Sequence, residues 1–229
     1  MNRDEKLAEF VGALIGDGYI SYSRGKFKIG FTGHPLRDKE YFLYLKSLIY
    51  DLWGKEVRIV NRLRGLRIGF RSKSAIDELL SIGLPVGEKS GTITIPEFII
   101  RNPDLLTCTI RGIVDTDGSV FTSKKPGVRF YPSIEITTSS YRLALQLKSS
   151  LNAYGFRIPK IRGHRSKLST MVSYKVALYG FMNLERYLNV IGFSNPYKKI
   201  KAQKIEMGRM GFSEDRISFE PMTTRSSAD

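Results

Sequence analysis

The chain of 229 residues is 41% apolar and 26% charged, as is ordinary for a globular protein, but its net charge of +15 points to a polyanionic partner. Its single cysteine excludes an intramolecular disulfide, and one Cys with two His cannot assemble a normal structural zinc site. The first residues lack the apolar run of a signal peptide and no stretch of about 18 apolar residues could span a membrane, so we expect an intracellular, reducing compartment, the cytoplasm if the source is prokaryotic.

The first half of the chain is predicted to form a helix–hairpin–helix–hairpin–helix series. Asp4 can cap the first helix, and Gly18 suits a left-handed cap at its end. In the first hairpin Lys26 and Lys28 alternate with apolar residues, which predicts one basic and one apolar face. The predicted elements are a helix over residues 4–16, a hairpin over 19–32, a helix over 35–53, a hairpin over 56–71 and a short helix through 75–80.

The same series starts again after a connector at residues 86–104. Its elements are a helix leading to Asp117, a hairpin with its tip near 124–127, a helix over 141–154, a basic hairpin over 160–175, a helix over 181–191 and a final helix over 196–207. This repeat predicts an α+β fold of two αββαββα half-domains related by a pseudo-two-fold axis. We expect the first half-domain with its connector at 1–101, the second at 102–212 and a polar tail at 213–229.

Two nine-residue stretches, FVGALIGDG at 10–18 and IRGIVDTDG at 110–118, open the two halves. On a helix, small residues four positions apart form one stripe, which lets a second helix backbone approach closely. We therefore predict that the two helices pack against each other through the small residues Gly12, Gly16, Gly112 and Thr116. This packing would bring Asp17 and Asp117 side by side at the C-terminal ends of the helices.

An acid at a helix C-terminus is electrostatically misplaced, and two such acids together are more so. A penalty of this kind suggests that a cation lies between Asp17 and Asp117. Because only oxygen ligands are on offer, Mg²⁺ fits better than a softer metal. In a basic protein such a site suits the hydrolysis of a phosphodiester. The alternative is that each Asp-Gly is a plain turn, since this dipeptide is common in turns.

These two motifs resemble those of the two-motif LAGLIDADG homing endonucleases, the monomeric, pseudo-symmetric kind encoded in archaeal and organellar introns. The resemblance extends to about residue 207 and implies antiparallel sheets that form a DNA-binding saddle. It implies that Asp17 and Asp117 are the metal-binding acids, with Gly16 and Thr116 beside them in the metal site. It implies two or three Mg²⁺ ions, for which Mn²⁺ or Ca²⁺ can substitute in binding. The sixth motif position, Asp115 here, is not a catalytic ligand in the family, and the first copy has Ile15 there.

The family also places basic and polar residues around the metals. Aligning residues 82–84 with 191–193 sets Lys89 against Lys198, with Lys201 one turn beyond. Each of these lysines is a candidate to stabilise the phosphate in the transition state; the alternative is a contact with the DNA backbone or an ordinary surface lysine. The family's usual Gln or Lys at the end of each first hairpin is missing here. His34 stands near that position, either as a base that positions water or as an exposed residue at a helix start.

The four hairpins present basic and polar side chains alternating with apolar ones, and a twisted two-stranded ribbon fits the major groove. For any single residue, a solvated surface charge is the alternative to a DNA contact. The predicted DNA-binding residues are Lys26, Lys28, Arg58, Arg62, Arg64, Arg67, Arg71, Lys124, Arg129, Tyr131, Arg162, Arg165, Lys167 and Lys175.

The sequence is therefore interpreted as a Mg²⁺-dependent, site-specific homing endonuclease that acts on double-stranded DNA as a monomer. As the resemblance implies, the cut would be staggered across the minor groove, with one acid serving each strand. The alternative is a protein on the same scaffold that does not cut, either a maturase that binds its intron RNA or a DNA-binding regulator.

Overall fold

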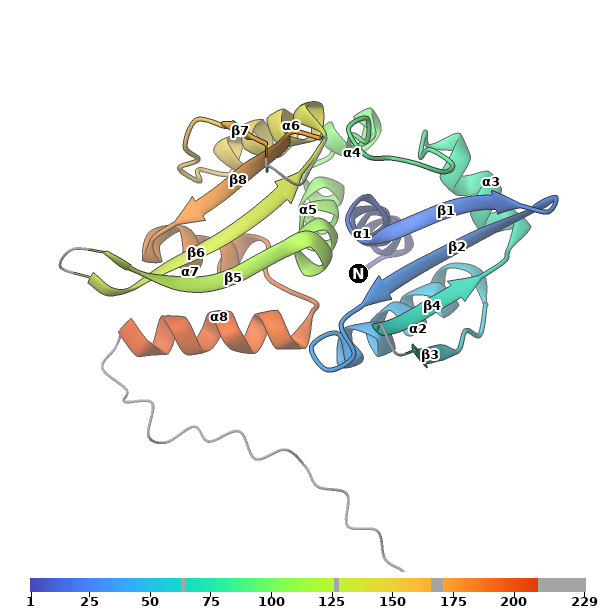
Figure 1. Cartoon of the computed structure of the whole chain (residues 1–229), viewed down its shortest axis with the longest axis horizontal. Helices are drawn as coiled ribbons and strands as arrows, with labels where there is room; N and C mark the ends of the chain where they lie inside the picture. Colours follow the sequence, from blue (N-terminus) through green and yellow to red (C-terminus); the bar gives the residue numbers. More distant parts are fainter. Residues whose placement is uncertain (63–64, 126–127, 166–170, 210–229) are drawn as a thin grey trace, which may run out of the picture.

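Two helices, α1 (Arg3–Ile15) and α5 (Pro103–Asp117), lie side by side at the centre of the molecule (Figure 1). The structure is a computed structural model that describes residues 1–62, 65–125, 128–165 and 171–209. Asn102 caps α5 by accepting hydrogen bonds from two backbone N–H groups, and Pro103 occupies the first turn, where a missing N–H is harmless. Each helix runs straight into a strand and so opens one half of the fold.

The first half is an antiparallel sheet with the strand order β1-β2-β4-β3 and helices that follow its hairpins. A short helix, α4 (Glu97–Ile100), lies in the segment that connects it to the second half. The elements after α1 are β1 (Gly18–Ser23), β2 (Lys26–Gly33), α2 (Lys39–Trp53), β3 (Ile59–Arg62), β4 (Gly65–Phe70) and α3 (Lys73–Ser81).

The second half repeats this arrangement in an antiparallel sheet with the order β5-β6-β8-β7. The elements after α5 are β5 (Gly118–Lys125), β6 (Val128–Thr138), α6 (Tyr141–Ala153), β7 (Gly163–His164), β8 (Ser173–Tyr179), α7 (Phe181–Val190) and α8 (Pro196–Arg209). The predicted α+β fold of two pseudo-symmetric αββαββα halves is confirmed. Helix α8 has no counterpart of similar length in the first half and lies along the β5 edge (Figure 1).

One face of each sheet is apolar and buried under helices, which lie behind the strands in the view of Figure 1. In β2 the side chains of Ile29 and Phe31 are buried, whereas those of Lys26 and Lys28 are exposed on the other face. This is the period-two alternation expected of a half-buried strand. Within the described residues, no helix combines the length and the apolar character needed to cross a membrane.

The two ends of the first helix differ from the sequence prediction. Asn2, not Asp4, is the cap, because its side chain accepts a hydrogen bond from Glu5 N at 2.9 Å while the Glu5 carboxylate accepts one from Asn2 N at 3.0 Å. Gly18 does not adopt the left-handed conformation. Glycine is needed there for close approach, since a Cβ would lie 2.7 Å from Leu14 Cα and 2.8 Å from Phe31 Cε1.

Other element boundaries also shift. Helix α2 begins at Lys39 and not at Pro35, because the chain first makes a turn in which His34 Nδ1 accepts hydrogen bonds from two backbone N–H groups at 3.2 Å. The last helix continues to Arg209, two residues beyond the expected end. Of the second basic hairpin, only Gly163–His164 pairs with β8 in the described part, and residues 166–170 lie outside it.

Candidate metal and nucleic-acid site

The two central helices touch through their glycines. A Cβ on Gly12 would collide with the backbone carbonyl of Thr109, and a Cβ on Gly112 would collide with the carbonyl of Glu9. The Thr109 hydroxyl also donates a hydrogen bond to Ala8 O across the interface, at 3.0 Å. Two backbones can approach this closely only where side-chain volume is absent.

The same contact continues to the helix ends. A Cβ on Gly16 would collide with the hydroxyl of Thr116, and this hydroxyl donates a hydrogen bond to Gly112 O at 2.9 Å. The structure thus places Gly12, Gly16, Gly112 and Thr116 in one interface, as the small-residue stripe predicted from the sequence requires.

A buried ion pair crosses this interface, and the sequence reasoning missed it. Glu9 is 0% exposed, and its carboxylate accepts hydrogen bonds from Arg111 Nη1 and from the Tyr44 hydroxyl, both at 2.9 Å. Arg111 Nε donates in turn to Ile191 O at 2.8 Å. Burial, followed by the charge of Glu9, raises the pKa of Tyr44, so that its hydroxyl stays a donor. The pair joins α1 to α5 and to the end of α7.

Asp17 and Asp117 stand at the C-terminal ends of the paired helices. Asp117 is the last residue of α5, and Asp17 follows Gly16, the C-cap of α1. Both side chains remain in contact with solvent. The surrounding protein nevertheless removes much of the water around Asp117, and the Asp17 carboxylate lies beside it, so burial first and this like charge second raise the pKa of Asp117 to about 7.

Lys89, from the connecting segment, lies on the end of the first helix. Its ammonium group donates hydrogen bonds to Leu14 O at 2.6 Å, to Ile15 O at 2.8 Å and to Gly16 O. Burial lowers the pKa of Lys89 to about 8, although the charges of Asp117 and Asp17 oppose this shift. The lysine therefore places a positive charge at the negative end of the helix, beside the two acids.

Lys198, from α8, takes the matching position on the second helix. Its ammonium group donates to Val114 O and Thr116 O, both at 2.8 Å. Burial lowers its pKa as well, and the charge of Asp115 is the largest effect opposing that shift. Lys201, one turn further along α8, makes no such contact; it lines a groove of about 390 Å³ together with His34, Arg37 and Lys198. His34 Nδ1 is already occupied as the acceptor in the turn before α2.

The residues at this point fit a hard divalent cation. Every donor is an oxygen: the carboxylates of Asp17 and Asp117 and the carbonyls at the helix ends, where Gly16 O and Thr116 O currently accept from the lysines. The raised pKa of Asp117 shows that the two acids repel each other when both are charged. In the part of the chain that the structure describes, no cluster of three or more His, Cys, Asp or Glu could hold a metal, so water or a substrate must supply the remaining ligands.

The exposed face of the first sheet gathers most of the DNA-binding residues predicted in that half. They line one open groove of about 550 Å³. The alternation in β2 and β4 turns Lys28 and Arg67 to this face, while Ile29 and Ile68 point into the core. The predicted residues in the groove are Lys28, Arg58, Arg62, Arg67 and Arg71; Lys26 is exposed at the start of β2, and Arg64 lies outside the described residues.

The second sheet presents a less basic face. Lys175 pairs with Glu135 at 2.7 Å, so its charge is largely neutralised within the sheet. Tyr131 is half-buried, with the Lys125 ammonium 4.7 Å above its ring. Lys124, Arg162 and Arg165 are exposed, whereas Lys167 and the side chain of Arg129 lie outside the described part. The structure does not bring these residues into one groove as it does in the first half.

Comparison with known proteins identifies the class. The WhiA LAGLIDADG-like domain model matches residues 7–100, and the LAGLIDADG-like domain model matches residues 104–192. The structure of the homing endonuclease I-DmoI in complex with DNA and Ca has a TM-score of 0.63 and 14% identity over 89% of this chain and 100% of that chain. The chain therefore belongs to the LAGLIDADG family. It is a two-motif member, with one LAGLIDADG-like domain in each half.

Two archaeal relatives contain a similar segment. The chain is 30% identical over 205 residues, 88% of its length, to part of the replication factor C small subunit of Methanocaldococcus jannaschii. It is 28% identical over 187 residues, 80% of its length, to part of the A-subunit of the A-type ATP synthase of Pyrococcus abyssi. These matches span only 10% and 16% of the two relatives, so the chain corresponds to a segment of each.

Proposed function

We propose that this protein is a metal-dependent, site-specific endonuclease that makes a staggered break in both strands of a DNA target. The observation that carries the proposal is the placement of Asp17 beside Asp117, each at the end of a helix whose last carbonyls hold a lysine. A close helix pair that ends in two repelling acids has no evident structural benefit, but it fits a cation at a reactive centre.

Asp17 and Asp117 would hold Mg²⁺, which when bound activates water and stabilises the leaving oxygen of a phosphodiester. Mn²⁺ would fit the same oxygen ligands, and Ca²⁺ would support binding. Lys89 and Lys198 supply positive charge next to the phosphate, which favours the negatively charged transition state. Their burial lowers their pKa values, so each is also able to give up or hold a proton near neutral pH. One acid and one lysine at each helix end would serve one strand.

The basic face of the first sheet and the charge of +15 support DNA as the substrate. The fold is shared with I-DmoI, whose structures were solved in complex with DNA. The pseudo-symmetry of the two halves suits a duplex, because one chain then supplies both half-sites as a monomer.

The relatives support a role in homing. The same segment occurs inside a replication factor and inside part of an ATP synthase, whose names share no activity. A segment carried by unrelated proteins is expected to have an activity of its own, and cutting an uninterrupted copy of its insertion site is one that explains such spread. The natural target is then the sequence that flanks the gene, rejoined as though the gene were absent.

Substitution of the two acids tests this proposal. Supercoiled plasmid carrying the rejoined flanking sequence is incubated with protein and Mg²⁺, and DNA binding is measured in parallel. We expect Asp17→Asn and Asp117→Asn each to lose linear product by at least about a thousandfold, on the scale of removing a catalytic group, while binding stays within about threefold. Asp4→Asn and Asp104→Asn are the matched controls, because each removes an exposed acid from the opposite end of the same helix. Linear product from both single Asn variants of the paired acids would refute the mechanism.

A second candidate is a DNA-binding protein on this scaffold that does not cut. The match of residues 7–100 to the WhiA domain model favours it. It predicts that the wild-type chain binds DNA and leaves it supercoiled in both Mg²⁺ and Mn²⁺.

A further inference from the structure

Asp115, the motif acid without a counterpart in the first copy, is enclosed in the protein. It is 1% exposed, whereas Ile15 occupies the matching position on α1. Its carboxylate accepts a hydrogen bond from Ser194 N at 2.7 Å, and its backbone carbonyl accepts one from Asn195 Nδ2 at 3.1 Å. Both contacts reach the two residues that precede α8.

Asn195 passes this connection on to α8. It is 0% exposed, and its side-chain oxygen accepts from Tyr197 N at 3.1 Å and from Lys198 N at 3.4 Å. These bonds make Asn195 the cap of α8. Its amide group also donates to Asp38 Oδ1 at 3.4 Å, which ties the cap to the first half of the molecule.

The connection closes on itself through Lys198. The ammonium group of Lys198 donates to Val114 O and Thr116 O, the two neighbours of Asp115 in the chain. The path thus leaves α5 at the Asp115 carboxylate, passes through Ser194 and Asn195 into α8, and returns to α5 through Lys198. A closed set of hydrogen bonds of this kind restricts the lysine to one place.

The first half holds its lysine differently. Lys89 comes from a segment outside any helix, and the Ile15 side chain beside its target carbonyls offers no hydrogen bond. That segment is fixed by backbone contacts such as Gly87 N to Ile20 O at 2.7 Å. Only the lysine of the second half therefore depends on a buried acid.

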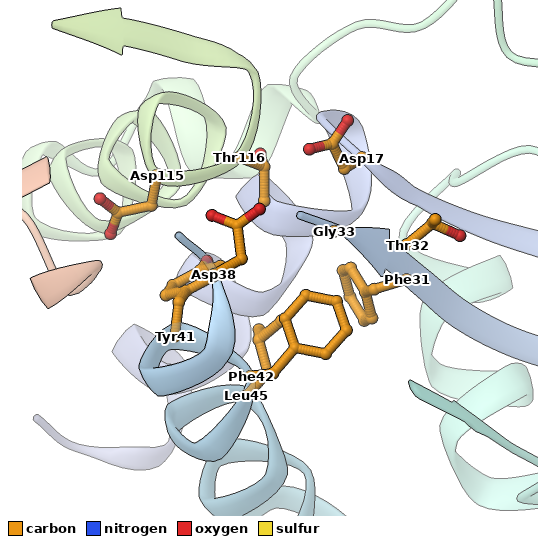
Figure 2. A pocket seen from close by; sticks show the side chains of 10 residues that line it. All are labelled: Asp17, Phe31, Thr32, Gly33, Asp38, Tyr41, Phe42, Leu45, Asp115 and Thr116. Atoms are coloured by element: carbon orange, nitrogen blue, oxygen red, sulfur yellow. The ribbon is translucent and has the colours of Figure 1, made fainter. Parts of the chain in front are cut away.

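A small cavity adds the first half to this arrangement. Figure 2 shows Asp115, Asp38 and Tyr41 among the residues around it. In the described part of the chain, Asp115 Oδ1 and the Tyr41 hydroxyl are buried without a hydrogen-bond partner. The cavity measures about 10 Å³, close to the room that one water needs, and a water there could bond to both atoms.

We propose that Asp115 is a positioning residue for Lys198 and thereby governs the cutting of one DNA strand and not the other. The part concerning the strands rests on the proposed endonuclease function. Asp115 itself touches no reacting atom; it acts only by holding Ser194 and Asn195, which set the start of α8.

The first test measures the lysine without any activity. The full chain, free of metal and DNA, is treated briefly with an amine-acetylating reagent, and the labelling rates of Lys198 and Lys89 are read by mass spectrometry. Asp115→Ile installs the residue that the first copy has, and we expect it to raise Lys198 labelling by about tenfold, the scale of one lost hydrogen bond to a charged group, with Lys89 labelling nearly unchanged. Asp115→Asn keeps an acceptor of the same shape and should leave both rates within about threefold.

The second test follows the two strands of the rejoined-site plasmid. We expect Asp115→Ile to yield nicked circles in which the intact strand is the one left intact by Lys198→Met, and Lys89→Met to spare the opposite strand. Asn195→Ala should act as Asp115→Ile does, without altering α5, and so keeps the test usable if Asp115→Ile folds poorly. Asp115→Asn should still give linear product.

The outcomes separate the two claims. Unchanged Lys198 labelling in both Asp115→Ile and Asn195→Ala overturns the positioning role, and so does equal slowing of both strands. If the wild-type chain binds the plasmid without cutting it, the endonuclease proposal fails, and the labelling result alone decides whether Asp115 positions Lys198.

Discussion

At the scale of single residues, the raised pKa of Asp117 sets the pH range in which the paired acids can bind a cation. At a pH below about 7 the carboxyl of Asp117 holds a proton in the metal-free protein, because burial and the Asp17 charge favour the neutral form. A cation needs the charged form, so its binding must release this proton. Above pH 7 the proton is already gone.

Calorimetry of Ca²⁺ binding in buffers of different ionisation enthalpy measures this release. We expect nearly one proton released at pH 6, very little at pH 8.5, and an apparent affinity that falls about tenfold for each pH unit below 7. Asp117→Asn should abolish both the binding and the release. Equal proton release at the two pH values would show that Asp117 is not the titrating ligand.

The residues that the sequence reasoning missed are polar and buried. Glu9 and Asp115 sit within apolar runs, and their partners Tyr44, Arg111 and Ser194 come from elements far away in the chain. A linear pattern cannot pair such groups, because the pairing depends on how the helices are rotated against each other. The Asn2 cap was within reach, since Asn2 and Glu5 have the spacing of a capping box.

At the scale of elements, the proposed centre depends on the close approach of α1 and α5. Gly12→Ala and Gly112→Ala should each lower the free energy of unfolding by about 1–3 kcal/mol, because the new methyl group meets backbone atoms that cannot move aside. Urea titration followed by circular dichroism measures this. Gly208→Ala is the control: it adds a methyl group to an exposed helix position with nothing within 4 Å and should be neutral or stabilising. Equal effects at all three positions would contradict the packing.

Most elements could be predicted because their patterns are local. Alternation identified the strands of the first sheet, and apolar residues at helical spacing identified α2. The choice between Lys198 and Lys201 could not be made in this way. Both lie on one helix, and which of them reaches the α5 carbonyls is decided by the buried cap at Asn195.

At the scale of the whole molecule, the two halves are expected to contribute unequally to DNA affinity. The arginines of the first sheet share one open groove, whereas Lys175 in the second sheet is paired with Glu135. Arg67→Ala should lower the slope of log affinity against log salt by about 0.9 for each phosphate that the arginine neutralises, and Lys175→Ala should change it much less. Fluorescence anisotropy with labelled duplex over a range of salt concentrations checks this, and equal slopes for the two variants would contradict it.

The central claim is that one chain cuts both strands at a centre formed by Asp17 and Asp117. Its most direct test is to map, on each strand of a labelled duplex with the rejoined flanking sequence, where the wild-type chain cuts in Mg²⁺. We expect one break in each strand, offset across the minor groove and abolished when the metal is chelated. A duplex that is bound yet intact on both strands in Mg²⁺ and in Mn²⁺ would contradict the claim.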